Sequence, residues 1–327
     1  MFRSMLAALV LLLMVAPFAF AEGNVTATVD GRGKLKVEGD DAGNVFQLVS
    51  ATPGSITFQP PEGGSTTTVN GLAMPVTVTG VTDKIEIKLE GGIDFLVVLF
   101  DAPKDLKIDL GEDLGDFVSV RGNVAKKLEI ESHYISVRDC SVGDKAKGEG
   151  TFLRFSNVVV GKSMDLESDG DAEVEIGVGG GEPWFGESEI PIAIRVVDCT
   201  IEESLKIKKY GPGGTVDVFT TSMGRDFKLT SQHENTLANL SVISVGGKCD
   251  IKLKDGADQI SMETFLIAKK TKIECKGGED TLSITDTTFE GNVKADGGDG
   301  EADTLNESAN TANDGADVQE FEQINRK

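Results

Sequence analysis

The chain has 327 residues, and its 54 acidic and 32 basic side chains give a net charge of −22 at pH 7. A surface this acidic repels polyanions, which argues against nucleic acid and anionic membranes as partners. Aromatic residues make up only 6% of the chain while glycine occurs 39 times, a composition typical of many short β-strands joined by turns.

Residues 1–21 have the pattern of a secretory signal peptide. Arg3 precedes an apolar run that is short for a membrane span, and Ala19-Phe20-Ala21 provides small residues around a cleavage site. The pattern predicts export through the Sec pathway to the periplasm, the cell surface or the extracellular space. No other stretch approaches the length of a membrane span, so none is expected.

Residues 22–104 predict short strands and tight turns without a regular repeat. Segments such as NVTATVDGRGKLKVEG alternate apolar and polar residues and are broken by glycine. The end of a stack of coils exposes unpaired backbone and apolar surface, which has to be covered. We therefore expect an N-terminal β-rich cap that merges into stacked coils near residues 84–110.

A repeat of 22 residues dominates residues 105–305. Its first position is occupied in successive units by Leu205, Phe227, Cys249, Thr271, Val293 and Gly315, with no gap needed. Each unit holds three short segments in which alternate residues are apolar, and looser copies begin at Asp105, Lys127 and Thr151. From about residue 306 the apolar positions are lost, so residues 306–327 predict a polar C-terminal cap or tail.

Three inward-facing segments per unit predict one turn of a triangular coil, and stacking the copies gives parallel strands roughly 4.8 Å apart. The expected fold is an all-β parallel β-helix of about 22 residues per coil and roughly nine or ten coils. Outward positions of the first segment also stack, as Lys206, Lys228, Asp250, Lys272 and Lys294. This charged column is a solvated sheet face or, alternatively, a regular lattice that binds a ligand.

One unit is too long, and the excess centres on residues 177–191, GVGGGEPWFGESEIP. Insertions in repeat proteins form loops on one face and often carry function. Trp184 and Phe185 lie beside Glu182 and Glu187, a set that could stack on a sugar ring and bind its hydroxyls. The alternative is that the two aromatic residues pack over the coils as a lid.

Four cysteines in an exported chain raise the question of disulfides. Cys249 and Cys275 occupy different inward positions, about 13 Å apart along the strand direction, which is too far for a disulfide. Cys140 and Cys199 share a position but are expected about three coils apart. All four are therefore predicted to be buried free thiols that behave as small apolar side chains.

Calcium is the one cofactor that the turns suggest. The segment GGDGEADTL at 297–305 resembles a calcium-binding nonapeptide repeat with one extra residue, and Asp258, Asp280 and Asp303 stand at matching turns. Carboxylate oxygens suit Ca²⁺, but nonapeptide sites need closely successive repeats and the spacing here is 22. Ordinary Asp/Gly turns remain the alternative.

Catalytic motifs are missing from the sequence. His133 and His233 are the two histidines, at unlike positions of different units, and neither zinc-ligand spacing nor a Ser-His-Asp arrangement occurs. The combined pattern of NTD, DD, GHG and RIK segments that is typical of polygalacturonases is missing, and so is the WxDH segment of pectate lyases. Acidic residues are so frequent that a pair of glycosidase carboxylates can be neither chosen nor excluded.

The segments GKLKVEGDDAGNVFQL, KIEIKLEGGIDFLVVL and CKGGEDTLSITDTTFEGN resemble the exported β-helical repeat proteins of planctomycetes and related bacteria. The resemblance is one of pattern and covers nearly the whole mature chain. It implies export and a right-handed parallel β-helix of the pectate-lyase-like architecture, and it implies no particular activity.

These observations predict a non-enzymatic exported scaffold of the cell envelope or matrix whose repeated surfaces adhere to a partner, with cell-surface or extracellular polysaccharide as the partner class. The alternative is a carbohydrate-binding or polysaccharide-degrading β-helix with its site near loop 177–191.

Overall fold

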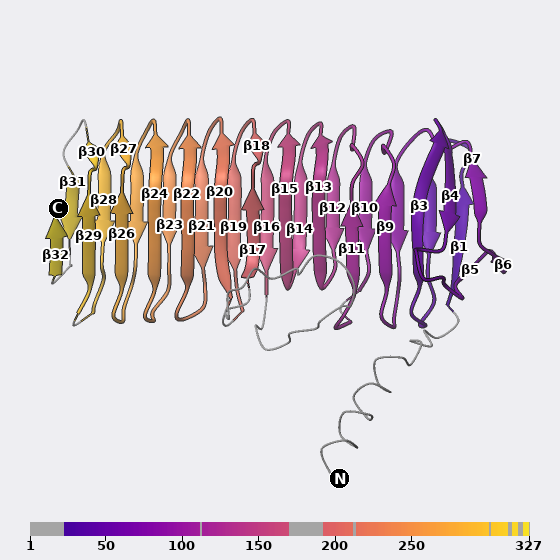
Figure 1. Cartoon of the computed structure of the whole chain (residues 1–327), viewed down its shortest axis with the longest axis horizontal. Helices are drawn as coiled ribbons and strands as arrows, with labels where there is room; N and C mark the ends of the chain where they lie inside the picture. The colour runs from indigo at the N-terminus through magenta and orange to yellow at the C-terminus, as the bar shows by residue number, and fades with distance from the viewer. Residues whose placement is uncertain are drawn as a thin grey trace, which may run out of the picture.

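A computed structural model describes residues 23–111, 113–169, 192–211, 214–300, 302–312, 316–319 and 323–326. Every regular element in these residues is a β-strand, and parallel sheets stack into an elongated β-solenoid of about nine turns (Figure 1). The predicted fold class is thereby confirmed. Residues 1–21, the predicted signal peptide, and the insertion 177–191 lie outside the described residues. None of the described segments forms a helix long and apolar enough to cross a membrane.

The first sheet takes one strand from each of these turns and further strands from the layers at the two ends of the stack. Its parallel strands are β2 (Leu35–Glu38), β8 (Ile85–Lys88), β10 (Leu106–Asp109), β12 (Leu128–Glu131), β14 (Ala146–Gly150), β16 (Met164–Ser168), β19 (Leu205–Lys209), β21 (Phe227–Ser231), β23 (Cys249–Lys252), β25 (Thr271–Glu274), β28 (Val293–Asp296) and β31 (Ala316–Gln319). Leu205 pairs with Phe227, and Phe227 pairs with Cys249. The 22-residue frame therefore sets the strand register.

The second sheet combines the second and third apolar segments of each unit. Its strands are β3 (Val45–Thr52), β9 (Phe95–Leu99), β11 (Phe117–Val120), β13 (Tyr134–Val142), β15 (Phe152–Val160), β17 (Ile192–Val197), β18 (Thr200–Ile201), β20 (Thr215–Met223), β22 (Leu237–Val245), β24 (Gln259–Ile267), β26 (Thr281–Thr285), β27 (Thr288–Phe289), β29 (Thr304–Ser308), β30 (Thr311–Ala312) and β32 (Gln323–Arg326). In most turns the two segments form one continuous strand rather than two separate ones.

A left-handed residue marks the bend between the second and third segments in eight successive turns. Positive φ angles between 46° and 56° occur at Asp139, Asn157, Asp198, Thr220, Val242, Thr264, Asp286 and Ala309, one per turn. Asn and Asp adopt this conformation most easily, and Asn157 also donates a hydrogen bond to Asp139 of the preceding turn at 2.7 Å. A β-branched residue at this point is strained.

Replacing Val242 by asparagine should therefore stabilise the protein. Val242 has a φ of 53° and is 51% exposed, so the change relieves backbone strain without removing a buried contact. We expect the free energy of unfolding to rise by about 1 kcal/mol, measured by urea denaturation. Val159→Asn is the control, because Val159 is also exposed but is not among the residues with a positive φ. Equal effects of the two changes would contradict the strain argument.

Inward positions of both sheets form one continuous apolar core. Phe227 and Leu229 of β21 are fully buried, and their counterparts in neighbouring turns are buried as well. Lys209 is an exception to this apolar core. It is a charged residue at an inward position of β19, and it is fully buried. Its Nζ donates to the carbonyl of Gly211 at 2.7 Å, and burial lowers the pKa of this amine against the opposing effect of Asp258.

The length of the turns varies more than the 22-residue frame suggests. The steps from Leu128 to Ala146 and on to Met164 are shorter, with 18 residues between paired positions. At the C-terminal end Val293 pairs with Ala316 rather than with Gly315, which corrects the gap-free alignment by one residue. The extra residue lies between Asp280 and Asp303, which are 23 residues apart and occupy one position.

The two ends of the stack are built differently. At the N-terminal end, antiparallel strands precede the parallel turns: β1 (Asn24–Val29), β4 (Ser55–Gln59), β5 (Thr68–Val69), β6 (Leu72–Ala73) and β7 (Val76–Thr79). β1 pairs with β2, β4 with β3 and β7, and β5 with β6, all antiparallel. At the C-terminal end β31 and β32 add a further parallel layer.

All four cysteines are buried and free, as their positions in the repeat predict. Cys140 pairs with Val158, which stands beside Cys199, so these two cysteines are two turns apart rather than three. The longer separation was wrong because the insertion adds residues without adding a turn. Burial raises the pKa of Cys199 to about 11 and that of Cys140 to about 12.

These thiols should be unreactive in the folded protein. We expect no reaction with DTNB under native conditions and reaction of all four after denaturation without a reductant, because a buried neutral thiol is a poor nucleophile. Finding two or no reactive thiols after denaturation would mean that a disulfide exists and that the assigned register is wrong.

Candidate functional site: an acidic groove beside a buried aspartate ladder

The turns that lead from the first sheet to the second lie along one long edge of the solenoid, the lower edge in Figure 1. Exposed carboxylates recur in these turns, and together we call them the acidic edge: Asp41, Glu90, Asp113, Asp169, Glu234, Asp255, Glu279 and Asp299. Lys254 and Lys276 are the exposed lysines in the same described turns. The edge is therefore a strip of negative charge parallel to the long axis.

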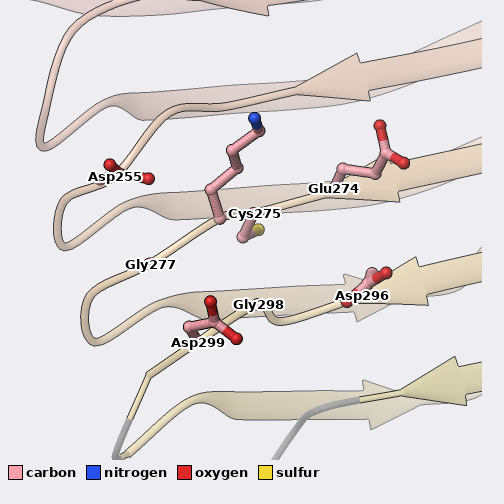
Figure 2. A pocket seen from close by; sticks show the side chains of 8 residues that line it. Asp255, Glu274, Cys275, Gly277, Asp296, Gly298 and Asp299 are labelled. Carbon is pink, nitrogen blue, oxygen red and sulfur yellow. The ribbon is translucent and has the colours of Figure 1, made fainter.

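A groove of about 480 Å³ opens in this edge, across the turns after β23, β25 and β28. It is lined by Asp255, Glu274, Cys275, Lys276, Gly277, Asp296, Gly298 and Asp299. Figure 2 shows Asp255 and Asp299 on the connecting turns, with Glu274 and Asp296 farther along the neighbouring strands. The position of Glu274 recurs as Asp296 in the next turn, whereas the position of Asp255 recurs as Asp299 two turns later, with Gly277 between them.

The turn backbones lie very close together under the groove. Gly298 has a φ of 89°, and a Cβ on it would stand 1.8 Å from the carbonyl oxygen of Lys276 in the preceding turn. The amide of Asp299 donates to that same oxygen at 2.6 Å. Glycine is required at position 298 because any side chain would push the two turns apart.

Two of the four groove carboxylates already have lysine partners. Glu274 forms ion pairs with Lys272 and with Lys252, the latter at 3.3 Å, and the hydrogen bond from Lys272 lowers the pKa of Glu274. Asp296 pairs with Lys294 at 3.2 Å. Within the described part of the chain, Asp255 and Asp299 make no ion pair, so their charges are the ones open to a bound cation.

Behind the groove a ladder of buried aspartates runs along the inside of the same turns. The amide of Thr236 donates to Asp258, that of Asp258 to Asp280 at 2.8 Å, and that of Asp280 to Asp303 at 2.8 Å. Asp94 and Asp116 continue the pattern near the other end, where the amides of Asn44 and Asp94 donate at 2.7 and 2.8 Å. All five aspartates are fully buried.

Burial makes ionisation of this aspartate ladder costly. Loss of water raises the pKa of Asp94, Asp116 and Asp258 to about 7 and that of Asp280 to about 6, even though each carboxyl accepts an amide hydrogen bond. Neighbouring carboxyls in adjacent turns add to the shift for Asp94, Asp258 and Asp280. These groups are structural acids that titrate near neutral pH.

The three aspartates that the sequence suggested as calcium ligands are members of this ladder. The structure brings Asp258, Asp280 and Asp303 into one column, but one oxygen of each accepts a backbone amide. The described residues contain no group of three or more His, Cys, Asp or Glu side chains placed to hold a metal ion.

We expect calcium to leave the melting temperature of the protein unchanged. A rise in the melting temperature of the natural protein with calcium that disappears in the Asp280→Asn variant would contradict this.

The second set of predicted site residues, Trp184, Phe185, Glu182 and Glu187, lies outside the described residues. A column of aromatic rings leads toward this insertion along the starts of successive strands of the second sheet. Phe95 stacks on Phe117 with centroids 4.8 Å apart, and Tyr134 stacks on Phe152 at 4.9 Å. The 22-residue frame does not reveal this column, because the shortened turns at β12 and β14 shift its spacing.

The groove is not evident from the sequence either. The repeat places Glu274 and Asp296 at outward positions of the first sheet, but nothing in their own units joins them to Asp255 or Asp299. The signal that could have found the groove is the recurrence of an exposed acid directly after the first strand in three consecutive units. Chemically, the arrangement favours binding of positively charged groups.

Comparison with protein-family models, with curated proteins and with solved structures found no match to this chain. The β-solenoid architecture therefore rests on the structure itself.

Proposed function

We propose that the protein is a non-enzymatic exported scaffold that acts through its repeated surfaces in the cell envelope or the extracellular matrix. The observation that carries this proposal is the register of the stack, which repeats each outward position of the first sheet in successive turns. Such a surface offers many identical weak contacts to an extended partner, and their combined strength can be large.

Ion pairs between turns support a persistent, rod-like surface. Lys107 pairs with Glu129 at 3.2 Å, Lys206 with Asp165 at 3.6 Å, and Lys252 with Glu274 at 3.3 Å, each across adjacent strands of the first sheet. Each exposed pair contributes little alone. As a network they keep the charged side chains in a fixed lattice, which favours adhesion to a regular polymer such as an extracellular polysaccharide.

A glycan array together with reducing-sugar assays on polysaccharides tests this function. Binding without release of sugar ends supports the scaffold. Turnover that disappears in Glu187→Gln or Glu182→Gln would replace it with the alternative, a carbohydrate-active solenoid whose site lies in loop 177–191.

The stacked aromatic column is the observation that favours this alternative. Phe152 at the start of β15 stands one turn before the strand that follows the insertion, and its neighbour Leu153 pairs with Ile194 of β17. Ligand-binding sites are lined mainly by apolar and aromatic side chains together with a few polar groups. Trp184→Ala should then abolish glycan binding, whereas the scaffold proposal predicts that it leaves binding by the first sheet intact.

A further inference from the structure

A second row of turns lies along the opposite long edge, the upper edge in Figure 1, where each turn of the second sheet leads to the next strand of the first. Exposed cations recur there, and together we call them the basic edge: Lys104, Lys126, Lys127, Lys145, Lys162, Arg225, Lys248, Lys269 and Lys270. Acidic residues also occur in these turns: Asp101, Asp105, Asp144, Glu202, Glu203, Asp226 and Glu290. On a chain of net charge −22 this edge is the exception.

These acidic residues are spread unevenly along the basic edge, so some parts of it keep an excess of positive charge. Glu202 and Glu203 separate two blocks of cations, and Asp226 is the acid within the second block. Asp226 accepts the backbone amide of Lys248 at 2.8 Å, so it serves the turn. Arg225, Lys248, Lys269 and Lys270, which we call the basic block, make no ion pair within the described residues.

The acidic edge carries a matching block at the same height along the rod. Glu234, Asp255, Glu279 and Asp299 follow the first-sheet strands of four consecutive turns, and the groove lies between the last three. Because both blocks belong to the same solenoid, their charges recur with the same rise per turn, roughly 4.8 Å. When two copies lie side by side, the charges of one block therefore have the same spacing as the charges of the other.

We propose that the basic block of one copy docks against the acidic block of a second copy, so that the rods associate side by side. This interaction rests on the proposed scaffold function and specifies how the scaffold would extend. The two blocks lie on opposite edges, so the contact is heterologous and leaves a free block on each outer side. Such contacts continue into open arrays rather than stopping at a dimer.

The association should depend strongly on salt. The contact is made by exposed charges, each pair of which is weak, and the net negative charge of both copies opposes their approach. Sedimentation velocity of the purified protein in about 20 mM NaCl should show species that grow with concentration, and about 300 mM NaCl should return monomers. A protein that is monomeric in both conditions overturns the proposal.

Charge reversal identifies the surfaces. Lys248→Glu, Lys269→Glu and Lys270→Glu together should weaken association at least about tenfold, and Asp255→Lys, Glu279→Lys and Asp299→Lys together should do the same. An equimolar mixture of the two triple variants should associate again, because each then offers the charge that the other lacks. Failure of the mixture to associate, with both variants folded by circular dichroism, overturns the pairing of these two edges.

The matched control reverses three exposed lysines on the flat outer face of the first sheet, Lys36→Glu, Lys88→Glu and Lys228→Glu. It changes the net charge by the same amount and should associate like the natural chain in the same buffer. A loss of association equal to that of the basic-block variant would mean that net charge, not the edge, controls the contact, and overturns the proposal.

A sulfated-polysaccharide column separates the proposal from its main rival. If the natural protein were monomeric and the column retained it but not the basic-block variant, the basic block would bind a polyanion instead. That result overturns docking of a second copy. Sedimentation uses no polysaccharide, so enzymatic turnover would disprove the scaffold function while leaving the result for association unaffected.

Discussion

Replacing Asp258, Asp280 and Asp303 by asparagine will flatten the pH dependence of unfolding between about pH 5 and pH 8. In the natural protein, burial holds the pKa of Asp258 at about 7 and that of Asp280 at about 6, whereas an unfolded aspartate has a pKa of about 3.9. The unfolded chain therefore releases protons at a lower pH than the folded protein does.

The sign follows from this difference. Stability from the protonated ladder is fully present below about pH 4 and is lost as the pH rises through about 7, so the natural protein should be more stable at pH 5 than at pH 8. We expect the triple variant to lose at least about 2 kcal/mol of that difference, since one pKa unit corresponds to about 1.4 kcal/mol. Urea unfolding at several pH values measures it.

Asparagine is a suitable replacement because Asn44 already occupies this column. Its side chain donates to the carbonyl of Ala42 at 2.7 Å while its backbone amide donates to Asp94. The matched control, Asp255→Asn with Asp299→Asn, changes exposed acids of neighbouring turns and should leave the slope unchanged. If the free energy of unfolding changed equally with pH in the triple variant and in the natural chain, the ladder would not titrate in this range.

Shortening Phe227 to alanine will destabilise the protein by about 3–5 kcal/mol. Phe227 is fully buried at the first position of β21 and lies between Leu205 and Cys249 of the adjacent turns. Each turn supplies part of its neighbours' core, so a cavity here weakens the contacts on both sides. Urea denaturation followed by circular dichroism measures the loss.

Lys228→Ala is the control for this change. Lys228 is the next residue of the same strand and points outward, so its removal should alter the stability by no more than about 0.5 kcal/mol. If the two substitutions had similar effects, the inward column would not be the core of the molecule.

The repeat predicted the fold because one physical requirement acts on every unit. A turn can bury its apolar face only against a neighbour, so Phe227, Leu229 and their counterparts had to recur at a fixed spacing, and the structure pairs them in that register. The sequence did not predict that the second and third segments of a unit join into one continuous strand. The left-handed residue where they meet differs in type between turns, from Asp139 to Val242, so it carries no uniform signal.

The site was harder to predict because its residues acquire their roles only through stacking. Asp258 and Asp255 belong to the same turn and are only three residues apart in the sequence. One is buried and accepts an amide of the preceding turn, while the other faces the groove. Similarly, Lys209 takes the inward position that follows Leu205 and Ile207, and only its charge argues locally against its burial.

The uniform register of the turns that begin at Phe227, Cys249 and Thr271 has an evolutionary consequence. A tandem duplication of one such unit in the gene would insert a complete layer whose upper and lower surfaces both match what they meet. The molecule could thereby be lengthened in steps of roughly 4.8 Å without redesign of its termini. The reach of the protein is thus a heritable trait that can change by recombination alone.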